Sequence, residues 1–125
     1  MKKVIISNEA PAAIGPYSHA ILTDSIAFLS GQIPLDPATG KLVEGGIEEQ
    51  TVQVLKNISA ILNTAGLTFD NVIKTTVFLS DLANFKTVNE IYGKYFTNDC
   101  PARSCVQVAA LPMGSLVEIE VICTR

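Results

Sequence analysis

The stretch Leu116-Val117-Glu118-Ile119-Glu120-Val121-Ile122-Cys123-Thr124 decides the fold, because its side chains alternate with the two-residue period of a β-strand. One face of this strand is apolar and suits a core packed against helices. The other face mixes apolar and acidic side chains, so we expect a sheet with one buried and one mixed face. The apolar face consists of Val117, Ile119, Val121 and Cys123, and the mixed face of Leu116, Glu118, Glu120 and Ile122.

A second strand is expected just before this one, from Arg103 to Val108, and Leu111–Gly114 would form the turn region of a hairpin between the two. If the valine side of the second strand joins the apolar face, its other side points away from the helices. A mixed apolar and charged face is a candidate subunit interface with a site in it. The side chains expected on that face include Arg103, Cys105, Glu118 and Glu120.

Two amphipathic helices are expected, at Ile47–Ala65 and Phe85–Phe96, because apolar residues recur there with the helical period. Gly66 is placed to end the first helix. So few helices cover only one face of a sheet, which predicts an α+β fold whose opposite face meets water or another subunit. The remaining strands are expected at Val4–Ser7, Tyr17–Thr23, Ile26–Ile33 and Val72–Leu79.

The 125 residues are expected to form a single domain, residues 1–125, because the sequence contains no internal repeat, low-complexity stretch or linker. Hydrophobic residues make up 48% of the chain and its mean hydropathy is +0.35. That composition is apolar for a monomer of this size, so it favours an oligomer.

Charge and cysteine content narrow the classes of function. The net charge is −3, the pI is about 5.0 and no block of Lys or Arg occurs, so no nucleic-acid partner is expected. No apolar run is long enough to span a membrane, and the N-terminus turns polar by Ser7, too early for a signal peptide. We therefore expect a cytoplasmic protein with no membrane partner. Three cysteines without CxxC spacing and a single histidine predict neither a disulfide framework nor a metal site.

Arg103, in Pro101-Ala102-Arg103-Ser104-Cys105, is the first candidate for chemistry. Its planar guanidinium matches a carboxylate in bidentate fashion. One interpretation is a structural cross-strand pair with Glu118 or Glu120, since such pairs are common in sheets. The other is a site in which the arginine binds a substrate carboxylate and a glutamate holds a water molecule.

Four further positions allow both a structural and a functional interpretation. Tyr17 suits a half-buried core position or the wall of a pocket. Gly31, within Ser30-Gly31-Gln32, suits a β-bulge or a close ligand contact. Asn89 is expected to be solvated on its helix. Cys105 is expected to be buried or at an interface, because a thiol nucleophile needs a nearby base.

Taken together, several segments resemble the RidA branch of the Rid family, the reactive intermediate deaminases. The resemblance extends over nearly the whole chain, and the Pro-Ala-Arg-Ser segment followed by the Glu-Ile-Glu strand is its most specific part. The segments are Ala12-Ala13-Ile14-Gly15-Pro16-Tyr17-Ser18, Ser30-Gly31-Gln32-Ile33-Pro34, Lys74-Thr75-Thr76-Val77-Phe78, Val88-Asn89, Pro101-Ala102-Arg103-Ser104-Cys105-Val106 and Glu118-Ile119-Glu120.

This resemblance implies a chorismate-mutase-like α+β fold with two helices packed on one face of a mixed sheet. It implies a homotrimer whose sheets face inward and whose sites lie between subunits. The implied activity is hydrolysis of 2-iminopropanoate and 2-iminobutanoate, or their enamine tautomers, to 2-keto acids and ammonia. Such imines escape from pyridoxal-phosphate enzymes, and their hydrolysis needs no cofactor and no metal.

The resemblance also implies roles for individual residues. Arg103 would bind the substrate carboxylate, and Glu118 would position and polarise the attacking water. Some of the pocket residues would come from the adjacent subunit, and Cys105 would contribute backbone groups. The sequence departs from the family pattern at Gln107, Ala110, Met113 and His19. The residues implied to line the pocket are Tyr17, Ser30, Gly31, Asn89, Arg103 and Cys105.

Three alternative functions remain open at this point. A non-enzymatic protein that binds small carboxylates, or a holdase-type stress protein, would keep the pocket without turnover. An RNA-directed role is disfavoured by the acidic pI. A chorismate-mutase-type rearrangement is suggested by the expected fold alone, and fold analogy is weak support for a function.

Overall fold

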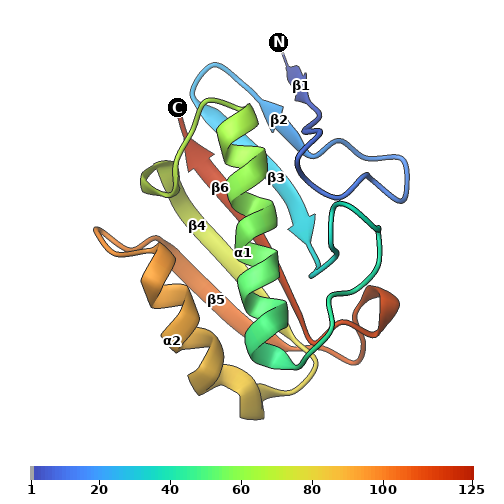
Figure 1. The fold of residues 1–125 in the computed structure, drawn as a ribbon. Helices are drawn as coiled ribbons and strands as arrows, with labels where there is room; N and C mark the ends of the chain where they lie inside the picture. The colour runs from blue at the N-terminus through green and yellow to red at the C-terminus, as the bar shows by residue number, and fades with distance from the viewer. Residues whose placement is uncertain (1) are drawn as a thin grey trace.

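The structure, a computed structural model, describes residues 2–125 and forms one six-stranded sheet with both helices on the same face (Figure 1). The strand order is β1-β2-β3-β6-β4-β5, and every neighbouring pair is antiparallel except β4 and β5, which are parallel. The predicted α+β class, with a mixed sheet and two helices on one face, is confirmed. The elements are β1 Lys3–Ile5, β2 Ala20–Leu22, β3 Ile26–Gln32, α1 Ile47–Thr64, η1 Phe69–Asn71, β4 Val72–Leu79, η2 Leu82–Asn84, α2 Phe85–Tyr95, β5 Ala102–Gln107, η3 Pro112–Gly114 and β6 Val117–Thr124.

The predicted hairpin between the last two strands is wrong. Strand β6 lies between β3 and β4, while β5 pairs with the far side of β4. Helix α2 carries the chain from β4 to β5, and a helical crossover of this kind produces a parallel pair. The segment after β5 then passes the end of β4, where the Val108 amide donates to the Leu79 carbonyl (2.9 Å) and the Ser80 amide donates to the Leu116 carbonyl (3.1 Å).

This pairing reverses the predicted orientation of β5. Arg103 pairs with Thr75 and Cys105 with Val77, and both β4 partners are fully buried on the helix side. Paired residues share a face, so Arg103 and Cys105 lie on the helix side and not on the open face, contrary to the sequence-based expectation. Val106 instead faces away from the helices and is 44% exposed. The expectation failed because it assumed that the valines of an edge strand must point into the core.

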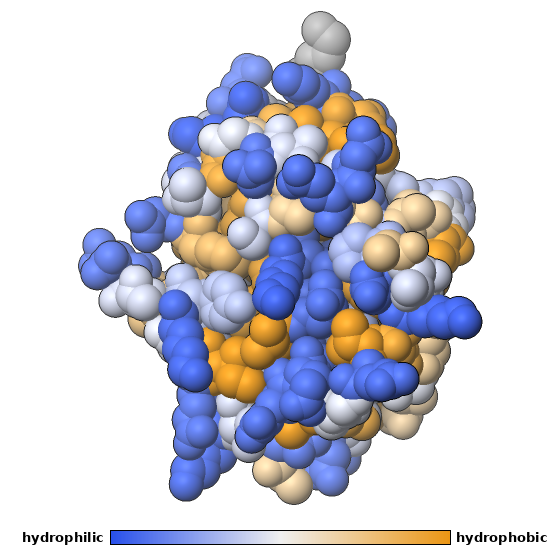
Figure 2. Space-filling view, viewed as in Figure 1, coloured by the Kyte–Doolittle hydropathy of each residue, from blue (hydrophilic) through white to orange (hydrophobic). Residues whose placement is uncertain are grey.

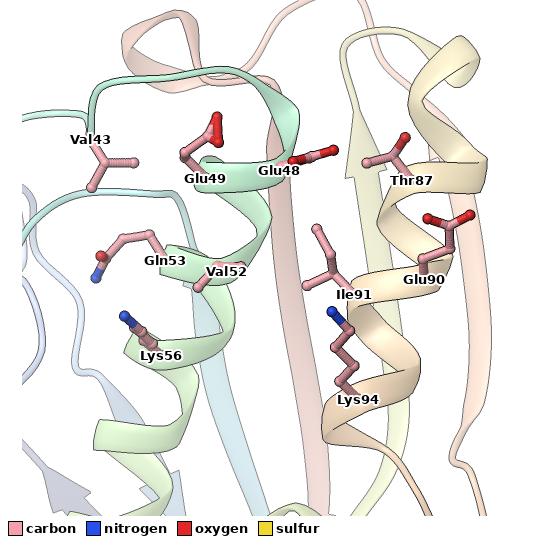
Figure 3. Close-up of a pocket in the computed structure, with 10 residues that line it drawn as sticks. All are labelled: Val43, Glu48, Glu49, Val52, Gln53, Lys56, Thr87, Glu90, Ile91 and Lys94. Carbon is pink, nitrogen blue, oxygen red and sulfur yellow. The ribbon is translucent and has the colours of Figure 1, made fainter.

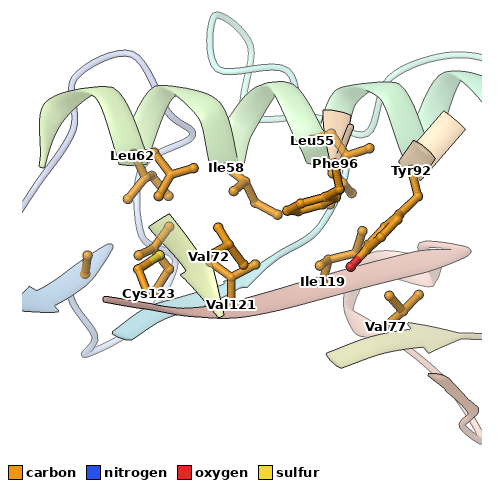
Figure 4. Packing of buried hydrophobic residues seen from close by; sticks show 14 of the residues in the cluster. Leu55, Ile58, Leu62, Val72, Val77, Tyr92, Phe96, Ile119, Val121 and Cys123 are labelled. Carbon is orange, nitrogen blue, oxygen red and sulfur yellow. The ribbon is translucent and has the colours of Figure 1, made fainter. Parts of the chain in front are cut away.

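The predicted apolar face of β6 is confirmed. Val117, Ile119, Val121 and Cys123 are each at most 1% exposed and lie beneath α1. Figure 4 shows side chains of α1 above this strand, together with the rings of Tyr92 in α2 and of Phe96 just after it. Burial raises the pKa of the Cys123 thiol to about 11, so this cysteine remains protonated in the core. The labelled residues in this layer above the strand are Leu55, Ile58, Leu62, Tyr92 and Phe96.

Helix α1 covers most of this face of the sheet, and its sequence defines both ends of the helix. The Glu49 side chain accepts a hydrogen bond from the Gly46 amide (2.8 Å), which satisfies an N-terminal donor. Gly66, at φ +76°, adopts the left-handed conformation that ends helices. On the helix side, hydrophilic residues surround smaller hydrophobic patches (Figure 2). None of the helices in residues 2–125 is long and apolar enough to cross a membrane.

The opposite face of the sheet is open and carries an apolar row across four strands. The register places Val4 beside Ile21, Ile21 beside Phe28 and Phe28 beside Ile122. Val4 is 50% exposed and Phe28 is 48% exposed. Together with the acidic residues of β6, this row forms the mixed apolar and charged face that the sequence predicted, and we call it the open face.

Replacing Ile119 with alanine should lower the free energy of unfolding by about 2–5 kcal/mol, because it leaves a cavity in the layer between β6 and α1. Urea denaturation at one fixed protein concentration measures the loss. Leu82→Ala is the control: Leu82 is 44% exposed, and its truncation should change the stability by less than about 1 kcal/mol. Similar losses in the two variants would contradict the position of Ile119.

Candidate active site

Arg103 is held on the helix side of the sheet by three residues of α2. Its Nη1 donates a hydrogen bond to Asn89 Oδ1 (2.7 Å). Its guanidinium carbon lies 4.9 Å from the ring centroid of Tyr92 and 5.5 Å from that of Phe85, within the range of cation–π attraction. These contacts fix the orientation of an exposed guanidinium, and its remaining donors are available for an anion.

The α2 residues that contact Arg103 share one side of the helix because they follow the helical spacing i, i+4 and i+7. The hydroxyl of Tyr92 is hydrogen-bonded to that of Thr75 in β4 (2.8 Å), which anchors the ring beneath the arginine. Burial raises the pKa of Tyr92 above 10.0, so the phenol is neutral. Phe85 and Tyr92 are among the apolar residues that predicted this helix by their helical period, and Asn89 was expected to be solvated. The exposure of Phe85, 39%, marks the part of this apolar stripe that faces the arginine.

Cys105 lies two residues after Arg103 on the same face of β5 and is partly buried. Desolvation raises the pKa of its thiol, and the nearby Arg103 charge only partly opposes this shift. The single histidine, His19, is buried elsewhere against Ser7 and Pro11. A neutral thiol without a base does not provide a nucleophile, which agrees with the structural interpretation of this cysteine.

Glu118 lies in a separate hollow of about 430 Å³ on the open face. Desolvation, followed by the repulsion of Glu120, raises the pKa of the Glu118 carboxyl above its ordinary value of 4.5. A carboxylate whose pKa moves toward neutrality in a hollow fits a general base. The hollow is lined by Ile14, Tyr17, Ser30, Gly31, Ile33, Pro112, Glu118 and Glu120.

Gly31 leaves the space that the Glu118 carboxylate occupies. The pairing of β3 with β6 shifts between Leu29 and Gln32, which agrees with the bulge, one of the two interpretations of Gly31. A Cβ atom at Gly31 would overlap the Glu118 carboxylate, so a larger residue displaces that side chain. Ser30 beside it donates its hydroxyl proton to the Ser18 carbonyl (2.6 Å).

Tyr17 forms one wall of this hollow and is 44% exposed, so its interpretation as a half-buried core residue is wrong. The Tyr17 hydroxyl accepts a hydrogen bond from the Ile14 amide (3.3 Å), which joins two residues of the same loop. Three apolar members of the wall could not be expected from the sequence, because isolated apolar residues in loops give no periodic signal. They are Ile14, Ile33 and Pro112.

The structure therefore divides the predicted site residues into two groups on opposite faces of the sheet. Glu118 pairs with Phe78, whose other neighbour is Val106, so all three lie on the open face. Arg103 lies on the helix side. A cross-strand pair of Arg103 with Glu118 or Glu120 within one chain is excluded by this arrangement. The first group consists of Tyr17, Ser30, Gly31 and Glu118, and the second of Asn89, Arg103 and Cys105.

A further hollow of about 500 Å³ lies between α1 and α2 on the outer surface (Figure 3). It contains acidic residues such as Glu48 and Glu90 and basic residues such as Lys56 and Lys94. None of the predicted site residues lines it. Within residues 2–125, no three His, Cys, Asp or Glu side chains are grouped so that they can hold a metal ion.

The site therefore consists of an arginine oriented by α2 and a partly desolvated glutamate, on an α+β sheet with both helices on one face (Figure 1). The family model described as Endoribonuclease L-PSP matches residues 7–125. The chain belongs to this family and, within it, to the RidA branch of the Rid proteins.

Relatives and solved structures agree with this assignment. The chain is 54% identical over 125 residues to mouse 2-iminobutanoate/2-iminopropanoate deaminase, covering 100% of this chain and 93% of the relative. It is 54% identical over 123 residues to the chloroplastic Reactive Intermediate Deaminase A of Arabidopsis thaliana, covering 98% and 66%. The Rid protein YyfA of Yersinia pestis superposes with a TM-score of 0.97 at 55% identity over both full chains. TdcF of E. coli with bound serine gives 0.93 at 44%, covering 98% of each chain.

Replacing Glu118 with glutamine should change how stability depends on pH. Because the pKa of Glu118 is raised in the folded state, its ionisation disfavours folding: the stability present at low pH is lost as the pH rises through the raised pKa. The variant should therefore match the wild type near pH 4 and be the more stable protein at pH 7. Urea midpoints across that range measure the difference.

Glu90→Gln is the matched control, because Glu90 is an exposed carboxylate on α2. Its pH dependence should follow the wild type. A Glu118→Gln variant whose stability also follows the wild type at every pH would contradict the desolvation of Glu118.

Proposed function

We propose that this protein hydrolyses 2-iminopropanoate and 2-iminobutanoate to the corresponding 2-keto acids and ammonia. Curated relatives at 50–54% identity over nearly the full chain carry the name 2-iminobutanoate/2-iminopropanoate deaminase. The observation that carries the proposal is the guanidinium of Arg103, which is oriented by Asn89 and Tyr92 and keeps free donors for a carboxylate.

Arg103 binds the substrate carboxylate through its planar fork of donors. Binding at this one point fixes the direction of the adjacent C=N bond and lowers the entropic cost of the attack. Asn89 accepts a hydrogen bond from Nη1 of Arg103 and so orients the guanidinium. Cys105 contributes backbone groups beside the substrate.

Glu118 positions a water molecule and accepts its proton as the water oxygen bonds to the imine carbon. The proton then passes to nitrogen and gives a carbinolamine. The C–N bond breaks as the remaining hydroxyl proton passes to nitrogen and the C=O bond forms, so the products are a 2-keto acid and ammonia. An imine carbon is already electrophilic, so the proposed reaction uses no cofactor, metal or covalent intermediate. General-base help of this kind contributes about 10²–10⁴-fold. Tyr17, Ser30 and Gly31 line the pocket around the water.

The two halves of this site come from different subunits of a homotrimer. Arg103 and Glu118 face opposite sides of the sheet, so a second chain must bring one to the other. The apolar row of the open face, with Phe28 at 48% exposure, supports an assembly that covers it. We place this protein in the cytoplasm, without nucleic-acid or membrane partners.

A non-enzymatic protein that binds small carboxylates is the second candidate. The solved structure of TdcF with bound serine supports it, because serine is a small carboxylate. The same Arg103 serves either function, but only hydrolysis requires Glu118. Glu118→Gln therefore separates the two: loss of turnover with ligand binding retained supports the enzyme. An RNA-directed function is suggested by the family name Endoribonuclease L-PSP, but the net charge of −3 disfavours it.

Replacing Arg103 with alanine should lower imine hydrolysis by roughly 100-fold or more, because the substrate carboxylate loses its charged, bidentate partner. An amino-acid oxidase with catalase generates the imines from alanine and 2-aminobutyrate, and semicarbazide traps what is not hydrolysed. The wild type should suppress semicarbazone formation in proportion to its concentration, and the variant should not.

Arg125→Ala is the matched control, because the guanidinium of this second arginine donates to the Thr23 carbonyl at the β2–β3 turn and not to a residue of the proposed site. It should retain wild-type suppression. Near-normal hydrolysis by a folded Arg103→Ala protein would overturn the role given to Arg103.

A further inference from the structure

His19 is the one buried ionisable side chain near the Glu118 hollow that the proposed mechanism does not use. It is 2% exposed and lies immediately before β2, which begins at Ala20. Its Nδ1 accepts a hydrogen bond from the Ser7 amide (2.9 Å), so the proton of the neutral ring is on Nε2, which donates to the Pro11 carbonyl (2.8 Å). The ring therefore joins the end of β1 to the loop that follows it.

This loop, residues 8–18, contains no helix or strand and carries Ile14 and Tyr17, two walls of the Glu118 hollow. Its middle is tied to the sheet at Pro11 by His19, and the Ile14 amide is bound only within the loop, to Tyr17. A hollow of about 260 Å³, lined in part by Ala10, Ala12 and His19, lies against the loop. Ala10 and Pro11 are buried, but Ala12 and Ile14–Tyr17 are exposed, so the bond from the imidazole to Pro11 is made where the loop leaves the core.

The backbone of His19 is also hydrogen-bonded to β3, on the other side of the Glu118 hollow. The backbone carbonyl of His19 accepts a hydrogen bond from the Ser30 amide (3.0 Å), immediately before Gly31. On the other side, Ser7 is fixed to α1, because the Thr64 hydroxyl donates to Ser7 Oγ (2.8 Å). A chain of hydrogen bonds thus extends from α1 through Ser7 and His19 to the loop that carries Tyr17.

We infer that His19 is a positioning residue of the proposed site, whose imidazole fixes the Ile14–Tyr17 wall against Glu118. This inference rests on the proposed function. Glutamine offers an acceptor and a donor in the positions of the two ring nitrogens. Its Oε1 accepts from the Ser7 amide, and its Nε2 donates to the Pro11 carbonyl. Leucine fills similar space but leaves both backbone groups without partners. Glutamine therefore substitutes for this histidine, and leucine does not.

The test compares His19→Gln, His19→Leu and Thr51→Val in the full-length protein. Thr51 is a matched control: it is fully buried, and its hydroxyl donates within α1 to the Ile47 carbonyl (2.7 Å), away from the loop. His19→Leu should raise KM for 2-iminopropanoate roughly tenfold while kcat changes less than about threefold, because the displaced wall is a binding element. Hydrogen exchange of the Ile14 amide should accelerate by about tenfold or more. His19→Gln should restore both values to within about twofold of the wild type.

Unchanged KM and unchanged Ile14 exchange in folded His19→Leu would overturn the inference, as would an equal rise of KM in Thr51→Val or a failure of His19→Gln to restore the wild-type values. If His19→Leu does not fold, His19→Asn gives the same readings, because its shorter amide cannot reach both partners. The exchange measurement needs no substrate. A wild type without imine hydrolysis would therefore overturn the proposed function, while the exchange rates still decide the role of His19.

Discussion

The parallel pairing of β5 with β4 is the constraint on which the rest of the structure depends. It places Arg103 beside Thr75 on the helix side, within reach of Asn89 and Tyr92 on α2. In the antiparallel hairpin that the sequence suggested, the arginine would face the open side and pair with the acidic residues of β6. The crossover through α2 prevents that pairing and leaves a guanidinium whose free donors face solvent.

The position of Glu118 follows from the same sheet. Strand β6 lies between β3 and β4, so the bulge at Gly31 makes room for the carboxylate, and the neighbouring strands desolvate it. The raised pKa and the unpaired arginine are thus two results of one topology. Each half of the site is incomplete within a single chain, which makes assembly part of the proposed chemistry.

The sequence predicted local structure better than strand pairing. Strand β4 has the predicted bounds, Val72–Leu79, and α1 ends one residue before the predicted Ala65, because period and caps are local properties. The neighbours of β5 depend on a long-range choice that the segment between Val108 and Leu116 does not encode. A loop of that length allows either a hairpin or a passage across the end of β4.

The candidate site, too, has features that the sequence indicated and features that it did not. The residues implied by the family resemblance lie in two compact groups, and the bulge at Gly31 was one of two interpretations of a glycine within a strand. Phe85 and Tyr92 were missed as partners of Arg103, because an aromatic stripe on a helix is usually core. That these two rings contact an arginine follows only from the orientation of β5, which turns Arg103 toward α2.

Complementation between two inactive variants tests whether the site is shared. Arg103→Ala and Glu118→Gln chains are unfolded together, refolded in equal amounts and assayed for imine hydrolysis, with light scattering to establish that the products are trimers. If each site takes Arg103 from one subunit and Glu118 from its neighbour, each variant alone is inactive and random mixing restores about a quarter of the wild-type sites. Mixed trimers without recovered activity, or a wild type that is active as a monomer, would contradict the account.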